Sequence, residues 1–75
     1  SGARRVVKET ALPLDHPVIG YRIDHVQWPT DTVLTAILRD GVPVAPSADV
    51  VIEGGDELFF ITTLDGEDQI RALFA

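Results

Sequence analysis

Two neighbouring carboxylate and imidazole pairs, Asp15-His16 and Asp24-His25, are the residues of this sequence best suited to acid–base chemistry or zinc binding. Adjacent residues point to opposite sides of a strand, or about 100° apart on a helix, so neither pair forms a site by sequence alone. The chain has no cysteine to complete a zinc site. We therefore predict solvated polar side chains, and a small metal-dependent enzyme built on His16 and His25 is the less favoured hypothesis.

Gly54-Gly55-Asp56 is the pattern most similar to a phosphate-binding loop. Such loops need a following helix N-terminus and usually a lysine, whereas an apolar run follows here, so we predict a tight turn. The hydroxyls of Ser47 and Thr62 lie in no recognisable nucleophile motif. The sequence therefore predicts no catalytic residue and no enzyme activity.

The negative charge is concentrated in the second half of the chain. The net charge is −6, and residues 39–75 hold two basic residues against eight acidic ones. Because such a surface repels phosphate backbones and anionic headgroups, we expect neither nucleic acid nor a lipid surface as a partner. The acids do not have the spacing of an EF-hand, so a solvated face is favoured over a cation site and we predict no metal.

Alternating and helical patterns place these residues on a small set of elements. The β-branched and apolar runs predict strands over 5–12, 32–39, 42–45 and 57–63. Asp40-Gly41 predicts a type I′ turn between the second and third strands. The second strand is apolar at nearly every position, which predicts that both of its faces are covered.

Two helices complete the predicted order. Ile19, Ile23 and Val26 have helical spacing, which predicts a short helix within 17–26, beginning as late as Gly20. Asp65 is predicted to cap a terminal helix whose apolar face is formed by Ile70, Leu73 and Phe74.

The length of 75 residues allows one domain with a small core. Without disulfides or a structural metal, packing or self-association must supply stability, so a dimer is expected. No apolar run reaches the roughly 18 to 20 residues that span a bilayer, so we expect no direct membrane insertion. Residues 1–4 are expected to be a linker or an added segment, with one domain over 5–75.

The order of several short motifs resembles a known family. Gly20 precedes the first predicted helix, Ile37-Leu38-Arg39-Asp40-Gly41 ends the second strand, Pro46 follows, and Gly55-Asp56 precedes an apolar strand. This order is similar to that of the TrkA-C domain, also called the RCK C-terminal (RCK_C) domain, over residues 5–75.

The resemblance implies an α+β fold with a small, mostly antiparallel sheet and two helices, in the order β-α-β-β-β-α, that forms a homodimer. It also implies a regulatory, ligand-sensing domain of a bacterial potassium channel, potassium uptake system or cation/proton antiporter. The partner would be a membrane channel or transporter subunit. The location would be cytoplasmic, peripheral or tethered to the inner membrane through the parent protein or its partner.

The resemblance implies no cofactor in this domain. A nucleotide of the NAD or ATP type would bind in a preceding Rossmann domain of the parent protein, because this chain has no Gly-x-Gly-x-x-Gly. A purely structural assembly domain without ligand sensing is the alternative function.

One branch of the family binds cyclic di-AMP at the dimer interface through an Asp, an Arg two positions on and a later Asn. Aligned on Asp24, the Arg and Asn positions fall on Val26 and Thr32. Neither side chain replaces the phosphate pairing or the adenine recognition that Arg and Asn supply, so cyclic di-AMP is disfavoured. Arg22 and Arg39 are the predicted contacts for a different anion at the dimer interface.

Overall fold

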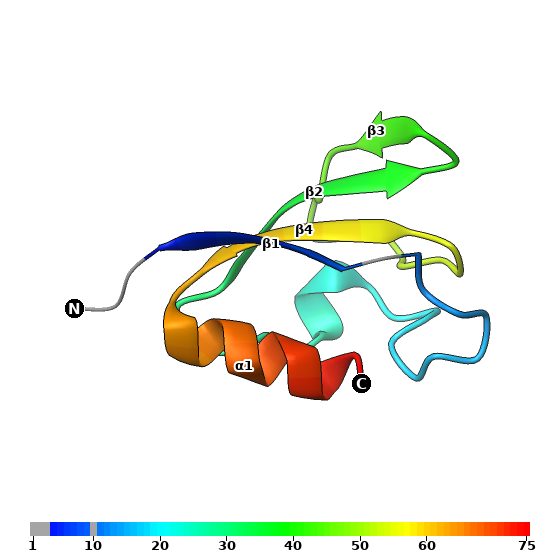
Figure 1. Ribbon diagram of the computed structural model, residues 1–75. Helices are drawn as coiled ribbons and strands as arrows, with labels where there is room; N and C mark the ends of the chain where they lie inside the picture. The colour runs from blue at the N-terminus through cyan, green and yellow to red at the C-terminus, as the bar shows by residue number, and fades with distance from the viewer. Residues whose placement is uncertain (1–3, 10) are drawn as a thin grey trace.

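The computed structural model describes residues 4–9 and 11–75 as a four-stranded antiparallel sheet with one α-helix beneath it (Figure 1). The strands β1 (Arg5–Glu9), β2 (Val33–Arg39), β3 (Val42–Val44) and β4 (Glu57–Thr62) lie in the order β1-β4-β2-β3. The helix α1 (Leu64–Leu73) follows β4 directly. These elements confirm the predicted α+β fold and its mostly antiparallel sheet.

The β2–β3 hairpin has the predicted turn. Asp40 and Gly41 both have positive φ, 52° and 76°, as a type I′ turn requires. Pro43 pairs with Leu38 on the edge strand β3, a position that tolerates a residue without an amide proton. The hairpin places Arg39 at the end of β2.

The predicted first helix is reduced to a single 3-10 turn, η1 (Ile23–His25). Gly20 has a φ of 90°, which breaks a helix, and its N–H donates to Ile52 O at 2.9 Å. The N–H of Ile23 donates to Val50 O at 2.9 Å, so these backbone groups bond across to residues 50–52 rather than along a helix. The expectation of a helix over 17–26 was therefore wrong in extent.

Two further boundaries differ from the predictions. The predicted strand over 5–12 is described as β1 up to Glu9, and Thr10 lies outside the described residues. Leu12 exchanges backbone hydrogen bonds with the turn before β4: its N–H donates to Asp56 O, and its carbonyl accepts from Gly55 N–H. The cap of α1 is Thr63, whose Oγ1 accepts from Gly66 N–H at 3.1 Å, so Asp65 lies inside the first turn instead.

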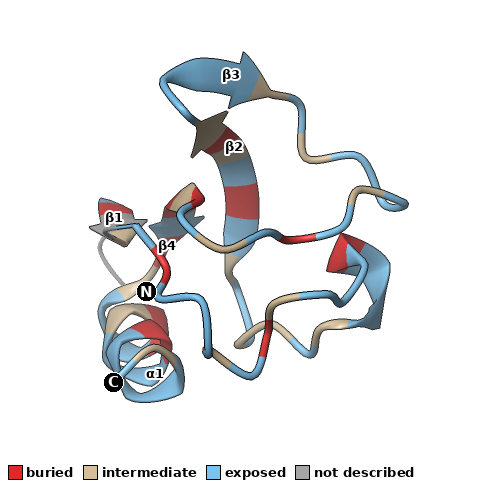
Figure 2. Ribbon diagram, turned by 90° about the vertical axis from the view of Figure 1, so that its right-hand side faces the viewer, coloured by how far each residue is buried: buried red, intermediate tan, exposed pale blue. Residues whose placement is uncertain are grey.

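The core lies between one face of the sheet and α1 with the long loop that contains η1 (Figure 2). Its members are the buried apolar residues Val7, Leu12, Val18, Ile23, Leu34, Ile37, Ile52, Leu58, Phe60 and Ile70. A bulge between Leu34 and Ala36 explains why β2 buries positions three apart. Within a single copy only one face of β2 is fully buried: Val33 on the other face is exposed, while Ala36 and Leu38 are half-buried. The prediction that both faces are covered is therefore not met within one copy of the chain.

No helix among the described residues has the length and apolar character to cross a membrane.

Candidate functional site

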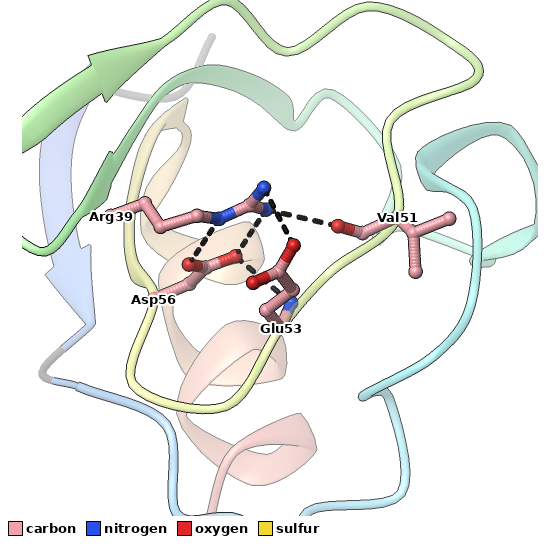
Figure 3. Close-up of polar contacts among 4 residues, drawn as sticks. All are labelled: Arg39, Val51, Glu53 and Asp56. Carbon is pink, nitrogen blue, oxygen red and sulfur yellow. Dashed lines mark hydrogen bonds and ion pairs between the residues drawn. The ribbon is translucent and has the colours of Figure 1, made fainter.

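Arg39 and Asp56 form a paired, two-point contact at the end of β2 (Figure 3). The guanidinium donates from Nε to Asp56 Oδ1 and from Nη2 to Oδ2, both at 2.9 Å. Asp56 is fully buried, so this carboxylate needs its charge and its oxygens satisfied within the fold. The hydrogen bond to Asp56 is the main cause that raises the pKa of Arg39 above its ordinary value.

The same guanidinium fixes the segment that precedes Asp56. Nη2 donates to Val51 O at 2.9 Å, and Nη1 lies 2.9 Å from Glu53 Oε2. Asp56 Oδ2 also accepts from the N–H of Glu53 at 3.0 Å. Arg39 and Asp56 therefore hold residues 51–56 in one shape. Both residues belong to the short motifs on which the family resemblance rests.

Arg22, the other predicted anion contact, lies at the surface just before η1. It pairs with Asp24 through Nε to Oδ1 at 3.0 Å and Nη2 to Oδ2 at 2.8 Å. This hydrogen bonding raises the pKa of Arg22 and lowers that of Asp24. Its backbone forms an isolated β-bridge with Val51, the residue whose carbonyl binds Arg39. The fold thus links both predicted arginines to one residue, and their contact with an anion stays a prediction.

A groove that sequence spacing did not reveal lies between the η1 loop and the end of α1. One hollow of about 460 Å³ is lined by His16, Pro17, Val18, Tyr21, His25, Val26, Gln27 and Leu73. A second of about 560 Å³ is lined by Gln27, Trp28, Pro29, Thr30, Gln69, Ala72 and Leu73. Because Gln27 and Leu73 line both hollows, we treat them together as the α1 groove.

Both histidines line this groove, and each has other partners. His16 Nδ1 accepts from Val18 N–H at 3.1 Å, and its Nε2 lies 3.3 Å from Leu73 O. His25 Nε2 lies 3.8 Å from Asp24 Oδ1. Within residues 4–9 and 11–75, no three histidine, cysteine or acidic side chains gather as metal ligands. His16 thus ties the loop to the last turn of α1, where it also stacks on Phe74.

Val26 and Thr32 stand at the positions that the resemblance assigns to the cyclic di-AMP anchors, and both are engaged within the fold. Thr32 Oγ1 and Thr62 Oγ1 share a hydrogen bond of 2.7 Å, and Thr32 Oγ1 also donates to Thr30 O at 3.3 Å. Val26 lies half-buried in the wall of the α1 groove. The Thr32 hydroxyl, one residue before β2, therefore links the start of β2 to the end of β4 beside Gly66 of α1.

Comparison with known proteins gives the class of this fold. The family model of the TrkA-C domain matches residues 7–75, and the chain belongs to this family. TrkA-C domains are the regulatory RCK class of potassium transport systems, which agrees with the motif order in the sequence.

Two curated relatives are potassium uptake proteins. Both are described as Trk system potassium uptake protein TrkA, from the CDC 1551 and H37Rv strains of Mycobacterium tuberculosis. Each is 37% identical over 65 residues, which is 87% of this chain and 30% of the relative. The chain thus spans less than a third of the length of these proteins.

Solved structures show the same fold. An RCK domain structure with "cda" has a TM-score of 0.78 and 14% identity, covering 93% of this chain and 97% of that chain. The RCK_C domain dimer of S. agalactiae BusR in complex with c-di-AMP has a TM-score of 0.72 and 25% identity, covering 96% and 95%.

Proposed function

We propose that this chain is the ligand-sensing and dimerisation domain of a regulator of bacterial potassium transport. The observation that carries the proposal is the TrkA-C match over residues 7–75 together with the 37% identity to Trk potassium uptake proteins. The BusR relative is a dimer of the same domain, which supports a homodimer here. One domain over residues 5–75, after a short linker, is part of this proposal.

The proposed regulation works by population shift. A ligand that binds one of two dimer arrangements more tightly favours that arrangement, and the membrane partner responds to the change. The partner is a potassium channel or uptake subunit, or the membrane part of a cation/proton antiporter. The domain then acts in the cytoplasm, held at the inner membrane by its parent protein or partner, and an NAD- or ATP-type nucleotide binds in another domain of the parent.

The proposed ligand contacts are the two arginines linked through Val51. The side chain of Arg22 is 46% exposed and is held by Asp24, which an anionic ligand can displace. The side chain of Arg39 is less accessible, at 26% exposed. It donates to the carbonyl of Val51, whose backbone forms the isolated β-bridge with Arg22. We propose that Arg22 contacts the anion first and that Arg39 fixes the backbone beside it.

Titration calorimetry of the 75-residue chain with inorganic phosphate, AMP and potassium chloride tests the sensing role, because NAD- or ATP-type nucleotides are assigned to another domain of the parent. The proposal predicts saturable binding of an anionic probe that Arg22→Gln weakens, whereas Arg71→Gln, an exposed arginine on α1, leaves it unchanged. A dimer that binds none of these probes would contradict ligand sensing and favour the purely structural assembly domain.

A further inference from the structure

His16 joins the loop after β1 to the last turn of α1 through both nitrogens of one ring. The N–H of Val18 donates to Nδ1 at 3.1 Å, and Nε2 lies 3.3 Å from the carbonyl oxygen of Leu73. The ring also stacks on Phe74, with the two ring centroids 5.1 Å apart. Figure 1 shows this loop and α1 on the same side of the sheet.

These contacts require one protonation state of the ring. Nδ1 needs a lone pair to accept from Val18, and Nε2 needs a hydrogen to donate to Leu73, so the hydrogen bonds assign the neutral Nε2–H tautomer to His16. A second proton, on Nδ1, would set two N–H groups against each other. Because Val18 belongs to the buried core, its N–H reaches another partner only if the loop moves.

The contact with α1 responds to the same proton in the opposite direction. An imidazolium still donates from Nε2 to the carbonyl of Leu73, and positive charge is favoured at the C-terminal end of a helix. The proton thus removes the contact with Val18 and keeps the contact with Leu73, so we expect the loop to shift while the fold persists. Histidine is the side chain that changes charge between about pH 5 and 8.

The titratable groups around the ring lie in its own loop, in η1 and after α1. Asp15 precedes His16, Tyr21 and His25 line the same hollow, and the carboxylate of Ala75 follows the last turn of α1. The charged side chains of α1 line neither hollow of the α1 groove, and these are Asp65, Glu67, Asp68 and Arg71. The lost bond to Val18 is therefore the contact that a proton on the ring changes directly.

We propose that His16 is a pH-sensitive latch between the loop after β1 and α1, closed when the ring is neutral and open when Nδ1 takes up a proton. Opening frees the loop at Val18, and it changes the hollow of about 460 Å³ that His16, Val18 and Leu73 line together. The α1 groove then has one shape with the neutral ring and another with the charged ring. The latch goes beyond the proposed function, because it needs neither an anionic ligand nor a second copy of the chain.

Nuclear magnetic resonance of the isotope-labelled 75-residue chain, titrated from about pH 8 to about pH 5, tests the latch. At the upper pH, the ring nitrogen shifts should identify the Nε2–H tautomer of His16. As the ring takes up its proton, the protection of the Val18 amide against hydrogen exchange should fall about five- to tenfold, as for the loss of one hydrogen bond. The opposite tautomer, a ring that stays neutral, or a Val18 amide whose protection stays constant while the ring titrates would overturn the latch.

One replacement of each histidine in the α1 groove separates the proton from the packing. His16→Asn places a carboxamide oxygen near the position of Nδ1 and takes up no proton, so the Val18 amide should stay protected over the whole pH range. His25→Asn is the matched control and should leave the pH response of Val18 as in wild type. A response that persists in His16→Asn, or disappears in His25→Asn, would overturn the latch. Circular dichroism checks that both variants fold, and the wild-type titration decides the matter if His16→Asn does not.

Discussion

At the scale of single residues, Arg39 and Asp56 show how the family motifs work physically. The arginine at the end of β2 and the acid before β4 lie 17 positions apart in sequence and meet through two hydrogen bonds of 2.9 Å. Sequence reasoning identified both positions but interpreted Asp56 as a turn former and Arg39 as an anion contact. Their pairing was not predictable, because it depends on the register between β2 and β4.

Replacing Asp56 with Ala should destabilise the fold by about 2–4 kcal/mol, because it leaves the Arg39 guanidinium without its buried partner. Urea unfolding followed by circular dichroism measures the loss. Asp24→Ala removes the partner of the exposed Arg22 and should change stability much less. Equal losses in the two variants would contradict the structural role assigned to Asp56.

Glu9 offers a test by pH. Burial raises its pKa above the ordinary 4.5, and the charge of Arg71 opposes the shift. The folded state therefore binds the Glu9 proton more tightly than the unfolded chain does. The resulting contribution of Glu9 to the stability of the fold is fully present below pH 4.5 and is lost as pH rises through the raised pKa. Glu9→Gln should be more stable than wild type at neutral pH, by less than about 0.5 kcal/mol. The difference should vanish in acid, and a less stable variant at neutral pH would contradict this account.

At the scale of elements, the turn and strand patterns predicted the structure more accurately than the helical spacing of Ile19, Ile23 and Val26 did. Asp40-Gly41 specifies positive φ at both positions, so the hairpin follows from two residues. The spacing of Ile19, Ile23 and Val26 is helical, yet Ile23 enters the core through a 3-10 turn while residues 50–52 take the backbone hydrogen bonds. The α1 groove also depends on this tertiary pairing, which is why no sequence pattern revealed it.

The junction of α1 with the sheet depends on a residue without a side chain. A Cβ on Gly66 would overlap Thr62 Oγ1 and lie 2.9 Å from Thr32 Oγ1, so Gly66→Ala must displace α1 or break the threonine pair. We expect a loss of about 1–3 kcal/mol, although alanine favours helix by about 1 kcal/mol over glycine. Gln69→Ala on the exposed side of α1 should change stability by less than about 0.5 kcal/mol. A thermal melt that rises in Gly66→Ala would contradict the close packing.

At the scale of the whole molecule, we predict that the fold shared with BusR does not bring its ligand with it. The BusR structure contains c-di-AMP. The positions that the family resemblance assigns to the anchoring Arg and Asn hold Val26 and Thr32 here, and the Thr32 hydroxyl binds Thr62 and Thr30. We expect no saturable c-di-AMP binding at micromolar concentrations by titration calorimetry. Val26→Arg with Thr32→Asn should gain affinity if those anchors are what is missing. Tight binding by the wild-type chain would show that other residues, such as those of the α1 groove, recognise the dinucleotide.

Measuring potassium uptake in cells shows whether this domain regulates potassium transport. Radioactive rubidium replaces potassium as the tracer, in a strain whose parent gene lacks residues 5–75 and in its wild type, with protein levels matched by immunoblot. We expect that uptake in the deletion strain no longer adjusts when external potassium changes. Uptake with the same rate and the same adjustment in both strains would contradict it.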